Sequence, residues 1–318
     1  MAQPLSLKLA DGTIVTGSSF LKQAPLVTQS SPAIPLVVLI HGGSVDCDSF
    51  DIDEKHSVRP LSEFLGVPVI SLNRPGYGGT TPLPPATDSK ETYIQRQGRW
   101  LHELALPAVW TESSKTLNAT SIVLYGCSVG GGVATVAAGL AGRSSPTYKL
   151  SGLVLSALGC SPDTAPMSRF FGDNYAITGK VIEIPHEFRQ KQAAGPHAAL
   201  FDVSVFSSRR GESNTSDAEV YDINIQWPTY WSDYAKDIRV QVLYSVGDAD
   251  TLWHLNADTM HEFGRAFKSS PWVESRLMTN VPHHIEYSYQ CSGFLLRVFG
   301  FALECAASFE IQEGRNRQ

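Results

Sequence analysis

Positive charge is scarce in this sequence and is not gathered into clusters. The 318 residues include 25 lysines and arginines against 31 aspartates and glutamates, which gives a formal net charge of −6. A nucleic-acid binder usually carries a basic stripe, and none is present. The longest apolar runs are also far shorter than the ~20 residues that span a bilayer. We therefore expect neither nucleic-acid binding nor a membrane-spanning helix.

Cysteine is equally sparse, and the familiar metal-binding motifs are missing. The five cysteines form no C-x-x-C pair, which argues against a disulfide framework and a structural zinc site. Neither H-E-x-x-H nor EF-hand spacing occurs, so we expect no metal and no cofactor. The first residues have neither the basic region nor the apolar region of a secretory signal. A cytoplasmic protein is the resulting expectation.

The sequence does contain the alternating pattern of an α/β protein. Six short runs rich in branched apolar residues cover 34–40, 67–71, 121–125, 153–156, 240–245 and 273–278. Such near-continuous runs are typical of strands that are covered on both faces of a parallel sheet. The helical stretches that alternate with them are 91–109, 131–140, 255–267 and 292–309. We predict a mostly parallel central sheet flanked by helices on both faces.

Residues 160–237 interrupt this alternation. They contain no clear strand and hold 11 of the chain's 31 aromatic residues. The aromatic residues of this segment are Phe170, Phe171, Tyr175, Phe188, Phe201, Phe206, Tyr221, Trp227, Tyr230, Trp231 and Tyr234. They indicate a second small core, a lid over an apolar pocket, or both. We divide the chain into a core of residues 1–159 and 238–318 and a helical lid of residues 160–237, and we expect a hydrophobic small-molecule substrate.

A G-x-S-x-G pattern, Gly126-Cys127-Ser128-Val129-Gly130, lies between the expected strand 121–125 and the helix 131–140. A serine on such a sharp turn projects its hydroxyl out of the sheet, and the flanking glycines let neighbouring chain pass closely. The turn also aims the helix N-terminus and the Val129 amide at a developing negative charge. A glycine-rich turn without chemistry, or a phosphate cradle, is the alternative. A P-loop, however, would have lysine where Val133 stands. The context predicts a nucleophilic Ser128.

A second glycine turn, His41-Gly42-Gly43-Ser44, directly follows the expected strand 34–40. With the serine turn, it resembles the α/β-hydrolase family, in the type that has a serine nucleophile and a lid. The resemblance implies the α/β-hydrolase fold. It also implies an oxyanion hole made by the amides of Gly43 and Val129, with Ser44 as the next choice after Gly43. For His41 we expect a structural role within the turn.

The resemblance also implies an acid and a base near the ends of later strands. The family's G-x-x-D turn matches Asp250 after the strand 240–245, and Asp248 is the alternative. The base follows the strand 273–278, where the family usually has Gly-His and this chain has His283-His284. We favour His284, with His283 as the alternative. The order serine, acid, base agrees with this fold.

These residue types predict hydrolysis of an ester-like bond, an ester, lactone or thioester, through an acyl-enzyme. Two alternatives stay open at this point. One is a family member that catalyses condensation, cyclisation or C–C cleavage in specialised metabolism. The other is a member that binds a ligand as a receptor.

Overall fold

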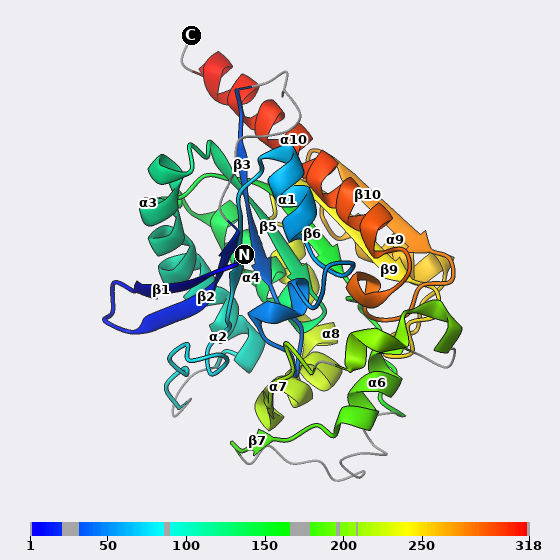
Figure 1. Cartoon of the computed structure of the whole chain (residues 1–318). Helices are drawn as coiled ribbons and strands as arrows, with labels where there is room; N and C mark the ends of the chain where they lie inside the picture. The colour runs from blue at the N-terminus through cyan, green and yellow to red at the C-terminus, as the bar shows by residue number, and fades with distance from the viewer. Residues whose placement is uncertain are drawn as a thin grey trace.

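The computed structural model describes residues 2–20, 32–85, 90–165, 179–194, 198–207 and 209–316 of the chain. Its main sheet has the strand order β1-β2-β4-β3-β5-β6-β9-β10 (Figure 1). The strands are β1 (Gln3–Lys8), β2 (Ile14–Phe20), β3 (Pro35–Ile40), β4 (Val69–Leu72), β5 (Ser121–Cys127), β6 (Leu150–Ser156), β9 (Gln241–Gly247) and β10 (Val273–Met278). Neighbours from β4 to β10 are parallel, and the β1–β2 hairpin joins β4 antiparallel. The predicted, mostly parallel sheet is confirmed.

The central strands are buried on both faces, as their unbroken apolar sequences predict. Every residue of β3 is buried. Because side chains alternate along a strand, Val38 and Ile40 enter one hydrophobic cluster, and Val37 and Leu39 enter the other. The sheet therefore separates two apolar cores, each of which needs a layer of helices.

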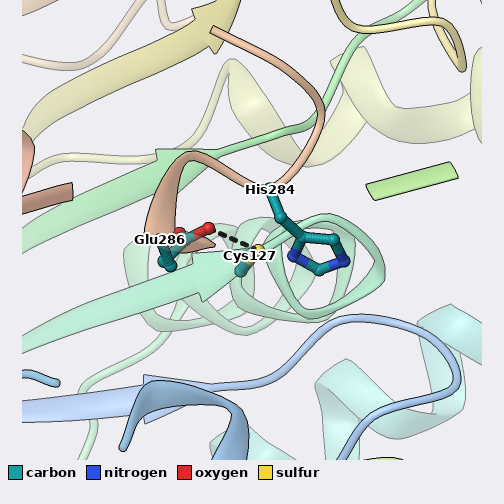
Figure 2. A group of neighbouring side chains, drawn as sticks. All are labelled: Cys127, His284 and Glu286. Atoms are coloured by element: carbon teal, nitrogen blue, oxygen red, sulfur yellow. Dashed lines mark hydrogen bonds between the residues drawn. The ribbon is translucent and has the colours of Figure 1, made fainter. Parts of the chain in front are cut away.

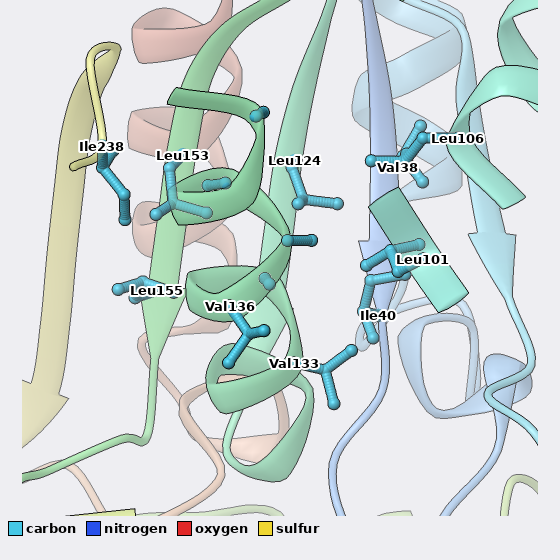
Figure 3. Packing of buried hydrophobic residues seen from close by; sticks show 14 of the residues in the cluster. Val38, Ile40, Leu101, Leu106, Leu124, Val133, Val136, Leu153, Leu155 and Ile238 are labelled. Carbon is cyan, nitrogen blue, oxygen red and sulfur yellow. The ribbon is translucent and has the colours of Figure 1, made fainter. Parts of the chain in front are cut away.

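Both helical layers are present. One core is covered by α2 (Tyr93–Trp100), α3 (Leu106–Thr116), α4 (Val129–Arg143), α8 (Trp227–Ala235) and α9 (Ala257–Arg265). The other is covered by α1 (Arg59–Leu65) and α10 (Cys291–Asn316). Figure 3 shows Val133 and Val136 of α4 in the same hydrophobic cluster as Leu124 of β5 and Leu153 of β6. No helix among the described residues combines the length and apolarity needed to cross a bilayer.

The described residues between β6 and β9 form two structural parts. The first holds the short ribbon of β7 (Val181–Ile182) and β8 (Thr215–Ser216), with α6 (His186–Ala194) and α7 (Asp217–Tyr221). The second is α8, whose aromatic side chains pack into the main core beside α4. The aromatic density of this segment thus serves core packing in α8. Phe170, Phe171 and Tyr175 lie outside the described residues.

Candidate active site

Ser128 occupies the tight turn between β5 and α4 and has a φ of 52°, a backbone conformation that is rare for a residue with a side chain. Glycine is required on both sides of it. A Cβ at position 130 would lie 2.2 Å from the carbonyl oxygen of Ile40, and one at position 126 would lie 2.4 Å from that of Gly130. The G-x-S-x-G pattern therefore reflects the close approach of α4 to β3 and β5.

A continuous hydrogen-bond chain begins at Ser128. Its Oγ lies 3.1 Å from Nε2 of His283, and Nδ1 of His283 lies 2.7 Å from Oδ2 of Asp250. Asp250 follows β9 and His283 follows β10, two adjacent parallel strands whose carboxyl ends meet at one edge of the sheet. The topology therefore brings together three side chains that are far apart in sequence.

The hydrogen-bond chain also fixes the imidazole tautomer. An ionised carboxylate can only accept hydrogen bonds, so Nδ1 of His283 donates to Asp250. In a neutral ring Nε2 is then the acceptor, and the Ser128 hydroxyl donates to it. The other oxygen of Asp250 accepts from the backbone amide of Leu252 at 2.9 Å. The arrangement leaves a basic nitrogen directed at the serine proton.

His284, which the sequence favoured, does not lie in this chain. Its ring stacks on Tyr287 with centroids 4.7 Å apart, and burial, with a smaller contribution from His283, lowers its pKa to about 3. His283, the alternative, takes the position beside Ser128. The family pattern favoured His284, but the backbone direction after β10 turns the side chain of His283 towards Ser128.

The two candidate acids differ in a similar way. Asp250 contacts His283, whereas Asp248 is exposed and points into the loop that follows β10. Oδ1 of Asp248 accepts hydrogen bonds from the amides of Asn280, at 2.7 Å, and Val281, at 3.4 Å. Asp248 therefore holds the start of the loop that carries His283 and does not contact the imidazole.

The glycine turn after β3 packs directly on the serine turn. A Cβ on Gly42 would lie 3.3 Å from Cβ of Ser128, and one on Gly43 would lie 3.2 Å from Cγ2 of Val129. Neither the Gly43 amide nor the Val129 amide donates to any group in the described part of the chain. Val129 is the first residue of α4, where an amide has no partner within the helix. Two free N–H groups are thus available beside the serine.

Arg74, a residue that the sequence analysis did not single out, holds this glycine turn. Its Nε donates to the carbonyl of His41 at 3.0 Å and its Nη2 to that of Gly42 at 2.8 Å. In a trans peptide the C=O and the following N–H point in opposite directions. Arg74 therefore directs the Gly43 N–H away from itself. His41 is fully buried, and burial lowers its pKa well below the usual value.

Glu219 of α7 completes this arrangement from a distant part of the sequence. It pairs with both terminal nitrogens of Arg74, with Nη2 of Arg74 3.0 Å from its Oε1, and both side chains are fully buried. Glu219 also accepts hydrogen bonds from Tyr77, Gln97 and Thr215. Arg74 lies in the turn that follows β4, and no local sequence pattern connects it with Glu219.

A buried carboxylate lies beneath the serine turn. Figure 2 shows Glu286 beside Cys127, with His284 on the other side of the sulfur. Oε1 of Glu286 accepts hydrogen bonds from Ser156, at 2.7 Å, and from Tyr125, while Oε2 accepts from Cys127 at 3.7 Å. One potential metal-ligand atom from each of Cys127, His284 and Glu286 lies within 4.8 Å of the other two, a spacing that a metal ion could use. Burial, and then Glu286, raise the pKa of Cys127 well above its usual value, so a neutral thiol donates here.

Ser128 opens onto a cavity with apolar walls and a few charged groups. Its apolar lining includes Ile52, Ile184, Val205, Phe206, Leu252 and Trp253. Its charged lining residues are Arg189, Arg209, Arg210, Glu212 and Glu219. The catalytic candidates therefore face a pocket that suits an apolar molecule with a polar group.

Comparison with known proteins agrees with this geometry. The profile described as "Alpha/beta hydrolase family" matches residues 37–284. The chain belongs to the alpha/beta hydrolase family. Among solved structures, this alpha/beta hydrolase resembles a putative lipase from Acinetobacter baumannii AYE, with 18% identity, a TM-score of 0.60, and coverage of 96% of this chain and 92% of the other.

Two further structures resemble this alpha/beta hydrolase. A thermostable carboxyl esterase from Bacillus coagulans gives 14% identity, a TM-score of 0.66, and coverage of 96% and 99% of the two chains. The thioesterase domain from the curacin biosynthetic pathway gives 14% identity, a TM-score of 0.56, and coverage of 94% and 99%. No curated protein sequence matches. At these identities the structural likeness establishes the fold.

Proposed function

We propose that this alpha/beta hydrolase is a serine hydrolase that cleaves an ester, thioester or lactone bond in a hydrophobic small molecule. The observation that carries the proposal is the hydrogen-bond chain from Ser128 through His283 to Asp250. A serine hydroxyl alone is a poor nucleophile at neutral pH and needs an adjacent base. His283 supplies that base, and Asp250 fixes its tautomer and stabilises the imidazolium.

In the proposed reaction, Oγ of Ser128 bonds to the substrate carbonyl carbon as its proton passes to Nε2 of His283. The electron pair of the carbonyl moves to oxygen, where the Gly43 and Val129 amides hold it, each contributing about 3 kcal/mol to lowering the barrier. The leaving group departs with the proton from His283. Water then bonds to the acyl carbon as its proton passes to Nε2 of His283. The bond between that carbon and Oγ of Ser128 breaks, Oγ takes the proton back from His283, and the acid is released.

The chemistry of the structural relatives supports this bond class. A lipase, an esterase and a thioesterase all cleave an acyl group from oxygen or sulfur. The apolar cavity walls support a hydrophobic substrate. We propose further that the predicted lid, residues 160–237, covers the site through the described part that precedes α8, since Ile184, Phe206 and Val220 line the cavity.

The direct test uses p-nitrophenyl esters of graded chain length and a fluorophosphonate probe. The wild-type protein should hydrolyse the esters and take up the probe, and Ser128→Ala should abolish both. Ser292→Ala, which changes an exposed serine of α10, is the matched control and should retain both. Turnover that survives Ser128→Ala would rule out the acyl-enzyme. An unlabelled wild-type serine would favour a receptor, and joined or cyclised products would favour the non-hydrolytic alternative.

A further inference from the structure

Arg189 of α6 is a nearly buried cation on the wall of the cavity that holds Ser128. Its side chain is only 10% exposed. Nε donates to the carbonyl of Ile184 at 2.9 Å, and Nη1 donates to the carbonyl of Ser44. Nη2 donates a hydrogen bond to no group among the described residues. A guanidinium carries five N–H donors in a planar fork, so this one retains unused donors at the cavity wall.

The charge of Arg189 is also poorly compensated. Its ion pair with Glu212 is long, at 4.0 Å, and Glu212 is engaged by Nδ1 of His186. Burial lowers the pKa of Arg189, with Glu212 and, more weakly, Glu183 acting in the opposite direction. A buried charge without a close partner is costly, and an anion that docked beside it would relieve that cost.

The other arginines near the site are used differently. Arg74 has close hydrogen-bond partners for each of its side-chain nitrogens. Arg210 pairs with Asp48 and Asp51. Arg209 is exposed. Arg189 alone among these four combines burial with a free donor, as far as the described residues show.

We propose that Arg189 binds a carboxylate of the substrate, which makes the substrate an ester-like derivative of a short aliphatic molecule with an anionic end. The proposal rests on the proposed serine hydrolase function. A planar guanidinium is suited to a carboxylate, with which it forms charge-assisted hydrogen bonds. The methylene groups between the two ends would lie on Val205, Phe206 and Trp253.

The position of Arg189 limits the length of that molecule. Arg189 holds the carbonyl of Ser44, the residue next to Gly43, whose amide is proposed to bind the oxyanion. Since neighbouring Cα atoms are about 3.8 Å apart, the guanidinium lies within roughly 10 Å of the reacting carbonyl. A carboxylate separated from that carbonyl by about two to six methylene groups would reach it, at ~1.2 Å of extension per bond.

The experiment compares charged substrates with neutral isosteres. One series consists of p-nitrophenyl monoesters of C4–C8 dicarboxylic acids, and a second consists of butyrate esters of ω-hydroxy acids. Each is paired with its primary carboxamide, which has the same shape without the charge. In at least one series, wild-type kcat/KM should be about 10- to 100-fold higher for the carboxylate, as a charged hydrogen bond predicts. Arg189→Met and Arg189→Gln should bring that ratio close to one.

Variants separate this role from simpler ones. Arg189→Lys keeps a positive charge and should keep part of the preference. Lys191→Gln removes an exposed charge from the same helix and should leave the ratio unchanged. If Arg189→Met slows charged and neutral substrates equally, the arginine only holds Ser44, and the proposal is overturned. Absence of any charge preference in both series of the wild type would overturn it as well.

Direct binding keeps the proposal testable without turnover. Titration calorimetry of Ser128→Ala with adipate should show binding that the Ser128→Ala, Arg189→Met double variant lacks. Equal binding by both proteins would contradict the proposed contact. Loss of neutral-ester hydrolysis by Ser128→Ala tests the serine hydrolase function separately, so failure of one proposal is distinguishable from failure of the other.

Discussion

Nδ1 of His283 lies 2.7 Å from Oδ2 of Asp250, and both side chains are almost completely buried. The contact joins the loops after two neighbouring parallel strands, so the sheet itself fixes the direction of the imidazole. A single-residue shift in the loop after β10 would present His284 instead. Backbone geometry thus decides which histidine faces Ser128, and the two adjacent histidines provide an internal comparison.

Replacing each histidine in turn should give very different losses. His283→Ala removes the proposed base and should lower kcat/KM for a p-nitrophenyl ester by about 10⁴-fold or more. His284→Asn removes a ring that stacks on Tyr287 and should change it by less than about tenfold, because no proton transfer is lost. The reverse ranking of the two variants would show that the imidazole beside Ser128 is not the base.

The two aspartates should separate into a catalytic and a structural effect. Asp250→Asn can still pack but favours the wrong tautomer of His283, and kcat should fall by about 10⁴-fold with little change in KM. Asp248→Ala leaves the amides of Asn280 and Val281 without their acceptor and should lower the free energy of unfolding by about 1–2 kcal/mol. Steady-state kinetics and urea unfolding of both variants measure the separation. A large kcat loss in Asp248→Ala at unchanged stability would contradict it.

Breaking the buried pair of Arg74 and Glu219 should affect both stability and catalysis. Glu219→Gln leaves a fully buried guanidinium without its counter-charge, which should cost about 3–5 kcal/mol in unfolding free energy. Arg74 also holds the carbonyls of His41 and Gly42. Its displacement should therefore move the Gly43 amide and lower kcat by up to about 10²-fold in the folded variant. Glu103→Gln, which breaks an exposed pair with Arg99, is the control and should cost at most about 1 kcal/mol. Equal costs for the two variants would show that burial does not strengthen this pair.

Asp222 should make stability depend on pH. It is buried, accepts hydrogen bonds from the Ile94 amide at 2.6 Å and the Tyr230 hydroxyl at 2.8 Å, and burial raises its pKa to about 6. A pKa raised by folding contributes stability that is complete below about pH 4 and is lost as pH rises through about 6. Asp222→Asn should therefore gain roughly 3 kcal/mol relative to the wild type between pH 4 and pH 8. Urea unfolding at both pH values measures the free energy of unfolding of the two proteins. A difference between variant and wild type that is the same at pH 4 and pH 8 would contradict a raised pKa at Asp222.

The fold and part of the site were accessible from the sequence because their signals are local. Apolar runs specify buried strands such as β3, and the glycines at 126 and 130 mark a turn that no larger residue fits. The choice between His283 and His284 was not accessible, because two identical neighbours differ only in backbone direction. Glu219 was not accessible either, since 145 residues separate it from Arg74 and no pattern spans that distance.

The buried ion pair between Arg74 and Glu219 holds α7 against the cavity that contains Ser128. Glu219 is the point at which this helix is tied to the turn beside Ser128, and separating it from Arg74 would strand two opposite charges away from water. Helix α7 therefore forms a part of the cavity wall that is held in place. A molecule that enters or leaves the cavity would therefore pass along a side other than α7, and a substitution that loosened α7 would also disturb the turn that carries Gly43.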